Sequence, residues 1–72
     1  MFDFAERLKL LRKENGVTQK QLAESIGVTE RAVRSYESGK MKPAFDAINS
    51  LADTFDVSAD YLLGRTDTPR LA

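Results

Sequence analysis

The chain has 72 residues, with eleven Lys and Arg, eleven Asp and Glu, and neither cysteine nor histidine. This length allows one small domain, and the missing residue types exclude disulfides, thiolate chemistry and most metal sites. The carboxylates and lysines are scattered and form no pair at the spacing of a shared site, which argues against an enzyme. We expect no metal and no cofactor, and no small-molecule site is evident. No apolar run approaches the ~18 residues that span a bilayer, so we expect a cytoplasmic protein without a membrane partner.

The charges sum to zero but are distributed unevenly. Residues 7–42 carry nine basic against four acidic side chains, whereas residues 43–72 carry two basic against five acidic ones. This asymmetry predicts one cationic face and one acidic face. A nucleic-acid partner is therefore compatible with zero net charge.

Apolar residues recur at helical spacing and nowhere alternate as in strands, which predicts an all-α protein. The first helix is expected over residues 3–15, where Phe4, Leu8 and Leu11 form one apolar stripe. Gly16 follows directly and is typical of the end of a helix.

A second helix is expected after Thr18. The spacing of Thr18 and Gln21 is that of a capping box, in which two side chains satisfy the free N–H groups of a helix start. This helix ends at Ile26, since Gly27 can adopt the left-handed conformation that closes a helix.

Three more short helices complete the pattern. The third runs from its cap Thr29 to Ser38, the fourth follows Pro43, and the fifth lies between its cap Ser58 and Gly64. The sequence thus predicts five short helices joined by tight turns.

The third helix divides into two faces on a helical wheel. Ala32, Val33 and Tyr36 share the apolar face. The other face is wholly polar and consists of Glu30, Arg31, Arg34, Ser35 and Ser38. Taken alone, this is the pattern of an ordinary amphipathic surface helix. The preceding helix ends only about three residues earlier, however, so the two helices must cross steeply, as in a helix-turn-helix.

The segment TQKQLAESIGVTERAVRSYESGK, followed by KP and by VSADYLLG, carries a family resemblance. It resembles the lambda-repressor-like, Cro-type (XRE family) helix-turn-helix proteins over about residues 5–64. The positions that match the family pattern are Leu22, Ala23, Gly27, Val28, Val33 and Tyr36. The resemblance implies a compact five-helix domain over residues 1–64, with the helix-turn-helix formed by helices two and three. Residues 65–72 are expected to form a flexible tail or linker.

The resemblance further implies a sequence-specific DNA-binding transcription regulator, a repressor of phage or mobile-element type. It would bind a two-fold operator in double-stranded DNA as a homodimer, with the third helix in the major groove and half-sites about one turn, ~34 Å, apart. Base reading is expected from Glu30, Arg31, Arg34 and Ser35. Phosphate contacts are expected from Gln19, Ser38, Lys40 and Lys42.

Four further residues are singled out. Arg12 and Glu37 match a pair that ties helix one to helix three in related repressors. The alternative is two independent surface charges, and the matching positions favour the pair. In the apolar cluster near the C-terminus, Leu63 is the candidate for a dimer seam. Ala44 departs from the family pattern, since this position often supplies the N-cap of helix four.

The alternative function is that of an antitoxin-like or adaptor module, which uses the same fold to hold a partner chain. Zero net charge and the acidic second half favour it. An interaction module would expose apolar anchors on its third helix, whereas this chain has Arg31 and Arg34 there.

Overall fold

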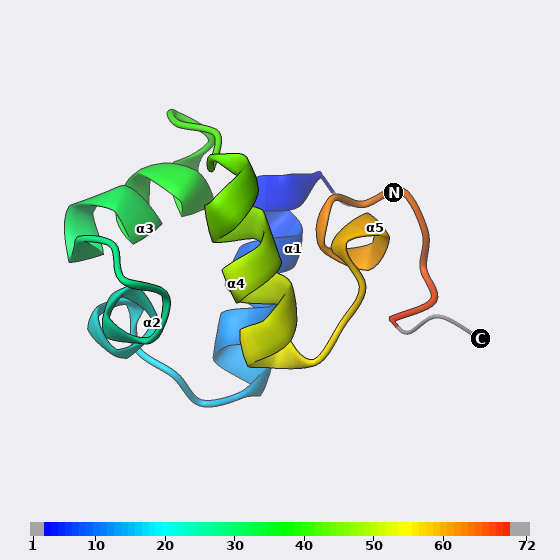
Figure 1. Ribbon diagram of the computed structural model, residues 1–72, viewed down its shortest axis with the longest axis horizontal. Coiled ribbons are helices and arrows are strands. Elements are labelled where there is room, and N and C mark those ends of the chain that lie inside the picture. Colours follow the sequence, from blue (N-terminus) through cyan, green and yellow to red (C-terminus); the bar gives the residue numbers. More distant parts are fainter. Residues whose placement is uncertain (1–2, 70–72) are drawn as a thin grey trace.

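Five helices follow one another through residues 3–69, the part of the chain that the computed structural model describes (Figure 1). They are α1 (Phe4–Glu14), α2 (Gln19–Ile26), α3 (Glu30–Ser38), α4 (Phe45–Phe55) and α5 (Ala59–Leu62). The prediction of an all-α, five-helix domain is confirmed. Among the helices of residues 3–69, none has the length and apolarity needed to cross a membrane.

Local sequence sets the ends of these helices. The Gln21 N–H donates to the Thr18 hydroxyl at 3.0 Å, and the Thr18 N–H donates to the Gln21 side chain at 2.9 Å, so the predicted capping box is formed. The first helix begins one residue later than expected, because Asp3 is its cap and accepts from the Glu6 N–H at 2.9 Å.

The turn between α2 and α3 is fixed by three adjacent residues. Gly27 has φ +73°, a conformation in which a side chain would be strained. Val28 packs against the core, and its N–H donates to the Ala23 carbonyl at 3.0 Å. Thr29 caps α3 by accepting from the Ala32 N–H at 3.0 Å. In Figure 1, α2 is seen nearly end-on while α3 lies across the view, so the helices cross steeply.

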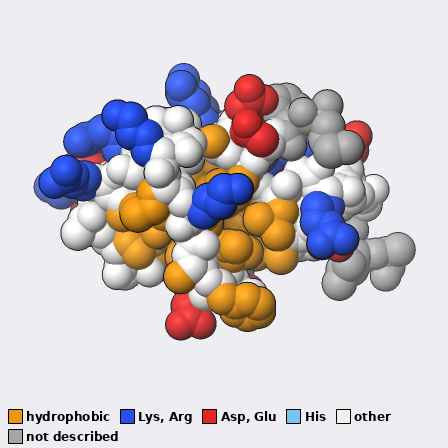
Figure 2. Space-filling view, turned by 90° about the horizontal axis from the view of Figure 1, so that it is seen from above, with side chains coloured by type: hydrophobic (Ala, Val, Ile, Leu, Met, Phe, Trp, Pro, Cys, Tyr) orange, Lys and Arg blue, Asp and Glu red, His pale blue; other side chains and the backbone are white. Residues whose placement is uncertain are grey.

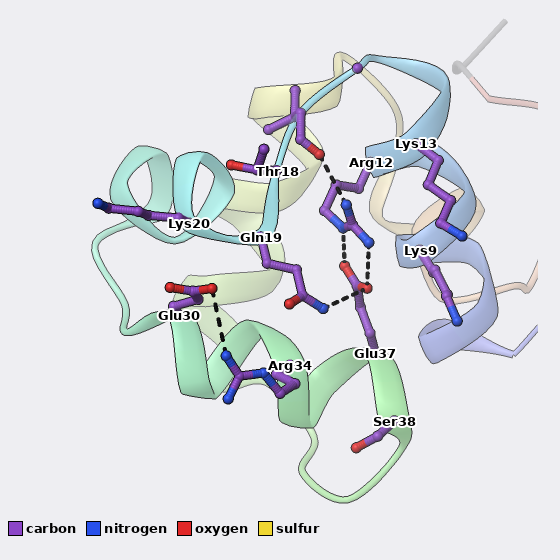
Figure 3. A pocket seen from close by; sticks show the side chains of 12 residues that line it. Lys9, Arg12, Lys13, Thr18, Gln19, Lys20, Glu30, Arg34, Glu37 and Ser38 are labelled. Carbon is purple, nitrogen blue, oxygen red and sulfur yellow. Dashed lines mark hydrogen bonds and ion pairs between the residues drawn. The ribbon is translucent and has the colours of Figure 1, made fainter.

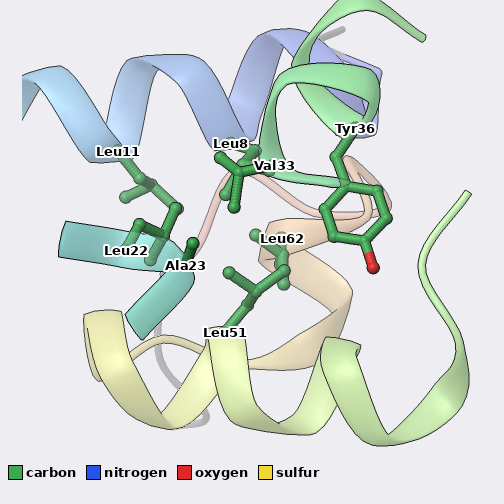
Figure 4. Close-up of a cluster of buried hydrophobic side chains, with 8 residues drawn as sticks. All are labelled: Leu8, Leu11, Leu22, Ala23, Val33, Tyr36, Leu51 and Leu62. Atoms are coloured by element: carbon green, nitrogen blue, oxygen red, sulfur yellow. The ribbon is translucent and has the colours of Figure 1, made fainter. Parts of the chain in front are cut away.

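The core joins all five helices (Figure 4). Each helix contributes at least one fully or nearly fully buried apolar side chain. The central cluster comprises Leu8, Leu11, Leu22, Ala23, Val33, Tyr36, Leu51 and Leu62. Because α3 inserts Val33 and Tyr36 into this cluster, its opposite, polar face is held outward on a fixed support.

The burial of two side chains differs from what the apolar periodicity of their helices indicates. Phe45, on the apolar stripe of α4, is 78% exposed. Arg7 is 2% exposed: its guanidinium lies 3.8 Å from the centre of the Tyr61 ring and forms an ion pair with Asp67 at 3.3 Å. A cation over an aromatic face is stabilised by the ring quadrupole, which explains how α1 accommodates a buried charge.

The segment after α5 contacts the domain. The Ser58 N–H donates to the Pro69 carbonyl at 2.7 Å, so the chain turns back across the start of α5. Residues 65–69 belong to the stretch expected as a flexible tail, whose last three residues lie outside the described part of the chain. The domain boundary at residue 64 stays a prediction.

The start of α4 lacks a side-chain N-cap, which a substitution of Ala44 can introduce. Ala44 has the extended backbone of a cap residue but no side-chain acceptor, as the sequence suggested. We expect Ala44→Thr to be more stable than Ala44→Val by about 1 kcal/mol, because only threonine can accept from the first turn. For a domain of this size the difference corresponds to about 4–8 °C in Tm. Equal melting temperatures for these isosteric variants would show that this helix end gains nothing from a cap.

Candidate nucleic-acid interface

The outer face of α3 carries two arginines, of which one is ion-paired within the described chain and the other is not. Arg34 forms an ion pair with Glu30 one turn before it, at 3.5 Å, and both side chains are about half exposed. Arg31 is exposed and has no ion pair with any residue between 3 and 69. Both guanidiniums retain N–H donors on the outer face, the type of group that bonds guanine edges or phosphates.

The end of α3 shapes the loop that follows. The Ser35 carbonyl accepts the N–H groups of Lys40 at 3.0 Å and Met41 at 3.3 Å, which turns the chain sharply after the helix. Lys40 and Lys42 are exposed on this loop. Ser38 lies at the same end, but its hydroxyl donates to the Ser35 carbonyl at 3.1 Å, so it must rotate before it can donate to a phosphate.

The structure joins Arg12 of α1 to Glu37 of α3. Arg12 Nε lies 2.5 Å from Glu37 Oε2 and Arg12 Nη2 lies 3.0 Å from Oε1, while Arg12 Nη1 donates to the Val17 carbonyl at 3.0 Å. The Glu37 side chain is 4% exposed and that of Arg12 13%. The hydrogen bond to Glu37 raises the Arg12 pKa above its ordinary value despite the opposing effect of burial, so the guanidinium stays charged.

Gln19 begins α2 and is tied to the same pair. Its Nε2 donates to Glu37 Oε1 at 3.2 Å. The backbone N–H groups of Gln19 and Lys20, in the first turn of α2, have no hydrogen-bond partner among the described residues. Free N–H groups and the positive end of the helix dipole favour an anion at this position. Gln19 is thus held in place where a phosphate contact was predicted.

A groove of ≈ 660 Å³ runs between α1, the start of α2 and the polar face of α3 (Figure 3). Its charged lining residues are Lys9, Arg12, Lys13, Lys20, Glu30, Arg34 and Glu37. The three lysines were not among the predicted site residues. Lys9 and Lys13 are one turn apart on the polar side of α1, and this spacing was the signal available in the sequence. Within residues 3–69 no three Asp or Glu side chains gather as a metal site would require.

A second, apolar surface lies on the face viewed in Figure 2, where hydrophobic side chains gather around a basic one. It contains a hollow of ≈ 450 Å³ formed by the start of α1, the α3–α4 loop, α4 and Leu63. Leu63 is 36% exposed, as is Leu10 on α1, and Met41 is 41% exposed. The predicted seam residue therefore lines an accessible apolar hollow, to which Lys42 also contributes.

Comparison with known proteins places this geometry in a family. The family model described as "Helix-turn-helix" matches residues 8–62. YobD of Bacillus subtilis (strain 168), an uncharacterized HTH-type transcriptional regulator, is 44% identical over 66 residues, which are 92% of this chain and 59% of that protein. RstR of Vibrio cholerae serotype O1, a cryptic phage CTXphi transcriptional repressor, is 38% identical over 63 residues, 88% of this chain and 56% of that protein.

Among solved structures, the P22 c2 repressor in complex with a synthetic operator superposes with a TM-score of 0.83 at 27% identity. The match covers 88% of this chain and 96% of that one. The chain spans 59% of the length of YobD and 52% of that of YqaE, another relative from Bacillus subtilis. The helix-turn-helix family model and the superposition agree with the steep α2–α3 crossing, and the sequence relatives point to the same family. The chain belongs to the helix-turn-helix family of lambda-repressor-like, XRE type.

Proposed function

We propose that the protein is a sequence-specific DNA-binding transcription regulator that places α3 in the major groove. The observation that carries the proposal is the outer face of α3, where Arg31 and Arg34 are exposed on a helix whose inner face is fixed in the core. Arginine bonds guanine O6 and N7 with two donors, and a recognition helix reads bases from such a face. Glu30 repels phosphate and is useful only opposite a base donor such as cytosine N4.

The similar proteins support this proposal and its finer form, a repressor of phage or mobile-element type. RstR is by its name a phage repressor, and P22 c2 is a repressor crystallised with an operator. We therefore place the protein in the bacterial cytoplasm, where its operator is accessible.

We also propose that it binds as a homodimer through the apolar hollow. Leu63 lines the hollow together with Met41, and both side chains are exposed. Exposed apolar side chains that cluster on one face are typical of a protein interface. The basic loop residue Lys42 lines the same hollow, so a dimer formed here would bring the two basic loops close to each other.

The dimer can be tested with a matched pair of variants. Leu63→Ser should raise the dimer dissociation constant about tenfold or more, because apolar contacts at the centre of an interface carry most of its energy. Leu10→Ser removes an equally exposed leucine that does not line the hollow and should leave the dissociation constant unchanged. Analytical ultracentrifugation measures both constants, and equal values for the two variants would place the seam elsewhere.

Selection of bound duplexes from a random pool tests the function itself. We expect an enriched palindrome with half-sites about one helical turn apart. Affinity for the selected duplex should fall steeply with salt, with a log–log slope of about −0.9 per phosphate neutralised. A pool that shows no enrichment, together with salt-independent binding, would contradict the proposal and favour the adaptor function.

A further inference from the structure

Arg7 joins three parts of the chain that are far apart in sequence. It lies on α1 and is 2% exposed. Its guanidinium lies 3.8 Å from the centre of the Tyr61 ring of α5 and forms an ion pair with Asp67 at 3.3 Å. A charge withdrawn from water needs partners of fixed position. Arg7 is therefore an anchor for α5 and for the segment that follows it.

Residues 65–69, here called the strap, are attached at both ends. The N–H of the first strap residue donates to the Asp60 carbonyl at 2.8 Å, and the carbonyl of the last, Pro69, accepts the Ser58 N–H at 2.7 Å. Between these points the Asp67 carboxylate reaches the anchor on α1. In Figure 1 the strap runs past α5 on the side of the molecule away from α3. The strap thus ties α5 to α1.

The position of α5 depends on these attachments more than the positions of the longer helices do. This helix has four residues, Ala59–Leu62, and a helix of that length is not stable by itself. Leu62 holds one side of it in the core. Its cap Ser58, which accepts from the Tyr61 N–H at 3.0 Å, is also the residue whose own N–H is bound by the strap. Loss of the strap contacts should therefore loosen the start of α5 first.

The candidate seam residue lies between α5 and the strap. Leu63 is the C-cap of α5, and the strap begins two residues later. The Leu63 side chain is 36% exposed and lines the apolar hollow together with residues from the start of α1 and the α3–α4 loop. The shape of the hollow therefore depends on where α5 lies relative to α1.

We propose that the strap controls the dimer. Docked on Arg7, it holds Leu63 in the position that a second copy contacts; released, it lets α5 shift and so weakens the dimer. The proposal rests on the proposed homodimer. Both protomers need a docked strap, so the docked fraction enters the apparent dissociation constant twice. A partner that binds residues 65–69 would separate the two copies without touching the hollow or α3.

The test substitutes Asp67, because its side chain is 91% exposed and the fold should be retained. Asp67→Asn should raise the dimer dissociation constant about fivefold or more, as an ordinary coupling between two sites does. Asp67→Lys should raise it further, because it places a second positive charge at Arg7. The matched control is Asp60→Asn, which makes the same change in an exposed carboxylate of α5 that pairs with Arg65 at the surface, and should leave the constant unchanged. Analytical ultracentrifugation measures all four proteins.

Amide hydrogen exchange reports the strap separately from the dimer. It is compared in the Leu63→Ser background, where dimerisation should be weak. Adding Asp67→Asn should speed exchange of the Ser58 N–H, which donates to Pro69, about fivefold or more. The Val28 N–H, in the turn between α2 and α3, should keep its rate. Faster exchange at both amides would mean a general loss of stability and would overturn a local release of the strap.

The possible failures are distinguishable. If Leu63→Ser weakens the dimer but both Asp67 variants have the dissociation constant of Asp60→Asn, control by the strap is overturned and the homodimer stands. If the wild type is monomeric at every concentration, the homodimer fails and the control fails with it. A weaker dimer in Asp67→Asn without faster exchange at Ser58 would overturn release of the strap as the cause.

Discussion

Replacing Glu37 with glutamine should lower the free energy of unfolding by about 1–3 kcal/mol, far more than a surface substitution does. The neutral amide cannot balance the charge of Arg12, whose side chain is 13% exposed and donates to both Glu37 oxygens. A charge left unpaired where water has little access is costly. The amide keeps one acceptor oxygen for the three donors that Arg12 and Gln19 direct at Glu37, so the start of α2 should loosen as well.

A double-mutant cycle separates this pair from the general effect of substitution. Arg12→Met and Glu37→Gln should each destabilise, and the double variant should be more stable than the sum of the single effects predicts, by about 0.5–3 kcal/mol. Glu30→Gln is the matched control, because Glu30 pairs with an arginine on the same helix but at the surface. It should change stability by less than about 1 kcal/mol. Additive effects of Arg12→Met and Glu37→Gln in thermal or urea unfolding would contradict a coupled pair.

The helix ends were predictable because they depend on residues three or four positions apart. Thr18 with Gln21, and Gly27 after Ile26, act within one turn, so the sequence pattern contains their whole cause. The cap Asp3 also precedes the first apolar stripe in the usual way, so the start of α1 depends on equally local residues.

The exposed Phe45 and the buried Arg7 were not predictable in this way. Phe45 continues the apolar stripe of α4, and only the packing of α4 on the other helices decides how far along the stripe the core extends. Arg7 is buried because Tyr61 and Asp67, more than fifty residues later, come to lie against it. Both cases depend on contacts distant in sequence.

The nucleic-acid interface was predictable where it depends on one helix and not where it depends on the packing of two. The outward face of α3 follows from its own periodicity, which contains the positions of Arg31 and Arg34. The lysines of α1 face α3 only because the two helices pack at a particular angle, and no local pattern specifies that angle. The spacing of Lys9 and Lys13 indicates that they share one face of α1, but only the packing of α1 on α3 brings that face to the groove.

The largest expected effect on DNA recognition comes from Arg31. Arg31→Ala should cost about 1–3 kcal/mol of binding free energy on the preferred duplex and far less on unrelated DNA. Arg31 is near the start of α3, is exposed and has no ion pair within residues 3–69, so its donors are available to a base. The preference should relax at one base pair of each half-site.

Lys42→Ala is the control, because its ammonium lies on the loop after α3 and can meet only a phosphate. It should weaken all duplexes by a similar factor and flatten the salt slope by about one unit. Neither Arg31 nor Lys42 belongs to the core, so the Arg31→Ala and Lys42→Ala variants should both fold.

One measurement tests most directly whether α3 reads DNA. It is the ratio of affinities for the selected and the scrambled duplex, determined at one salt concentration for the wild type, Arg31→Ala and Lys42→Ala. Arg31→Ala should lower this ratio by about 5- to 150-fold, which corresponds to 1–3 kcal/mol, while Lys42→Ala should leave it at the wild-type value. If Arg31→Ala weakens both duplexes equally, α3 holds the DNA without reading it, and another element reads the sequence.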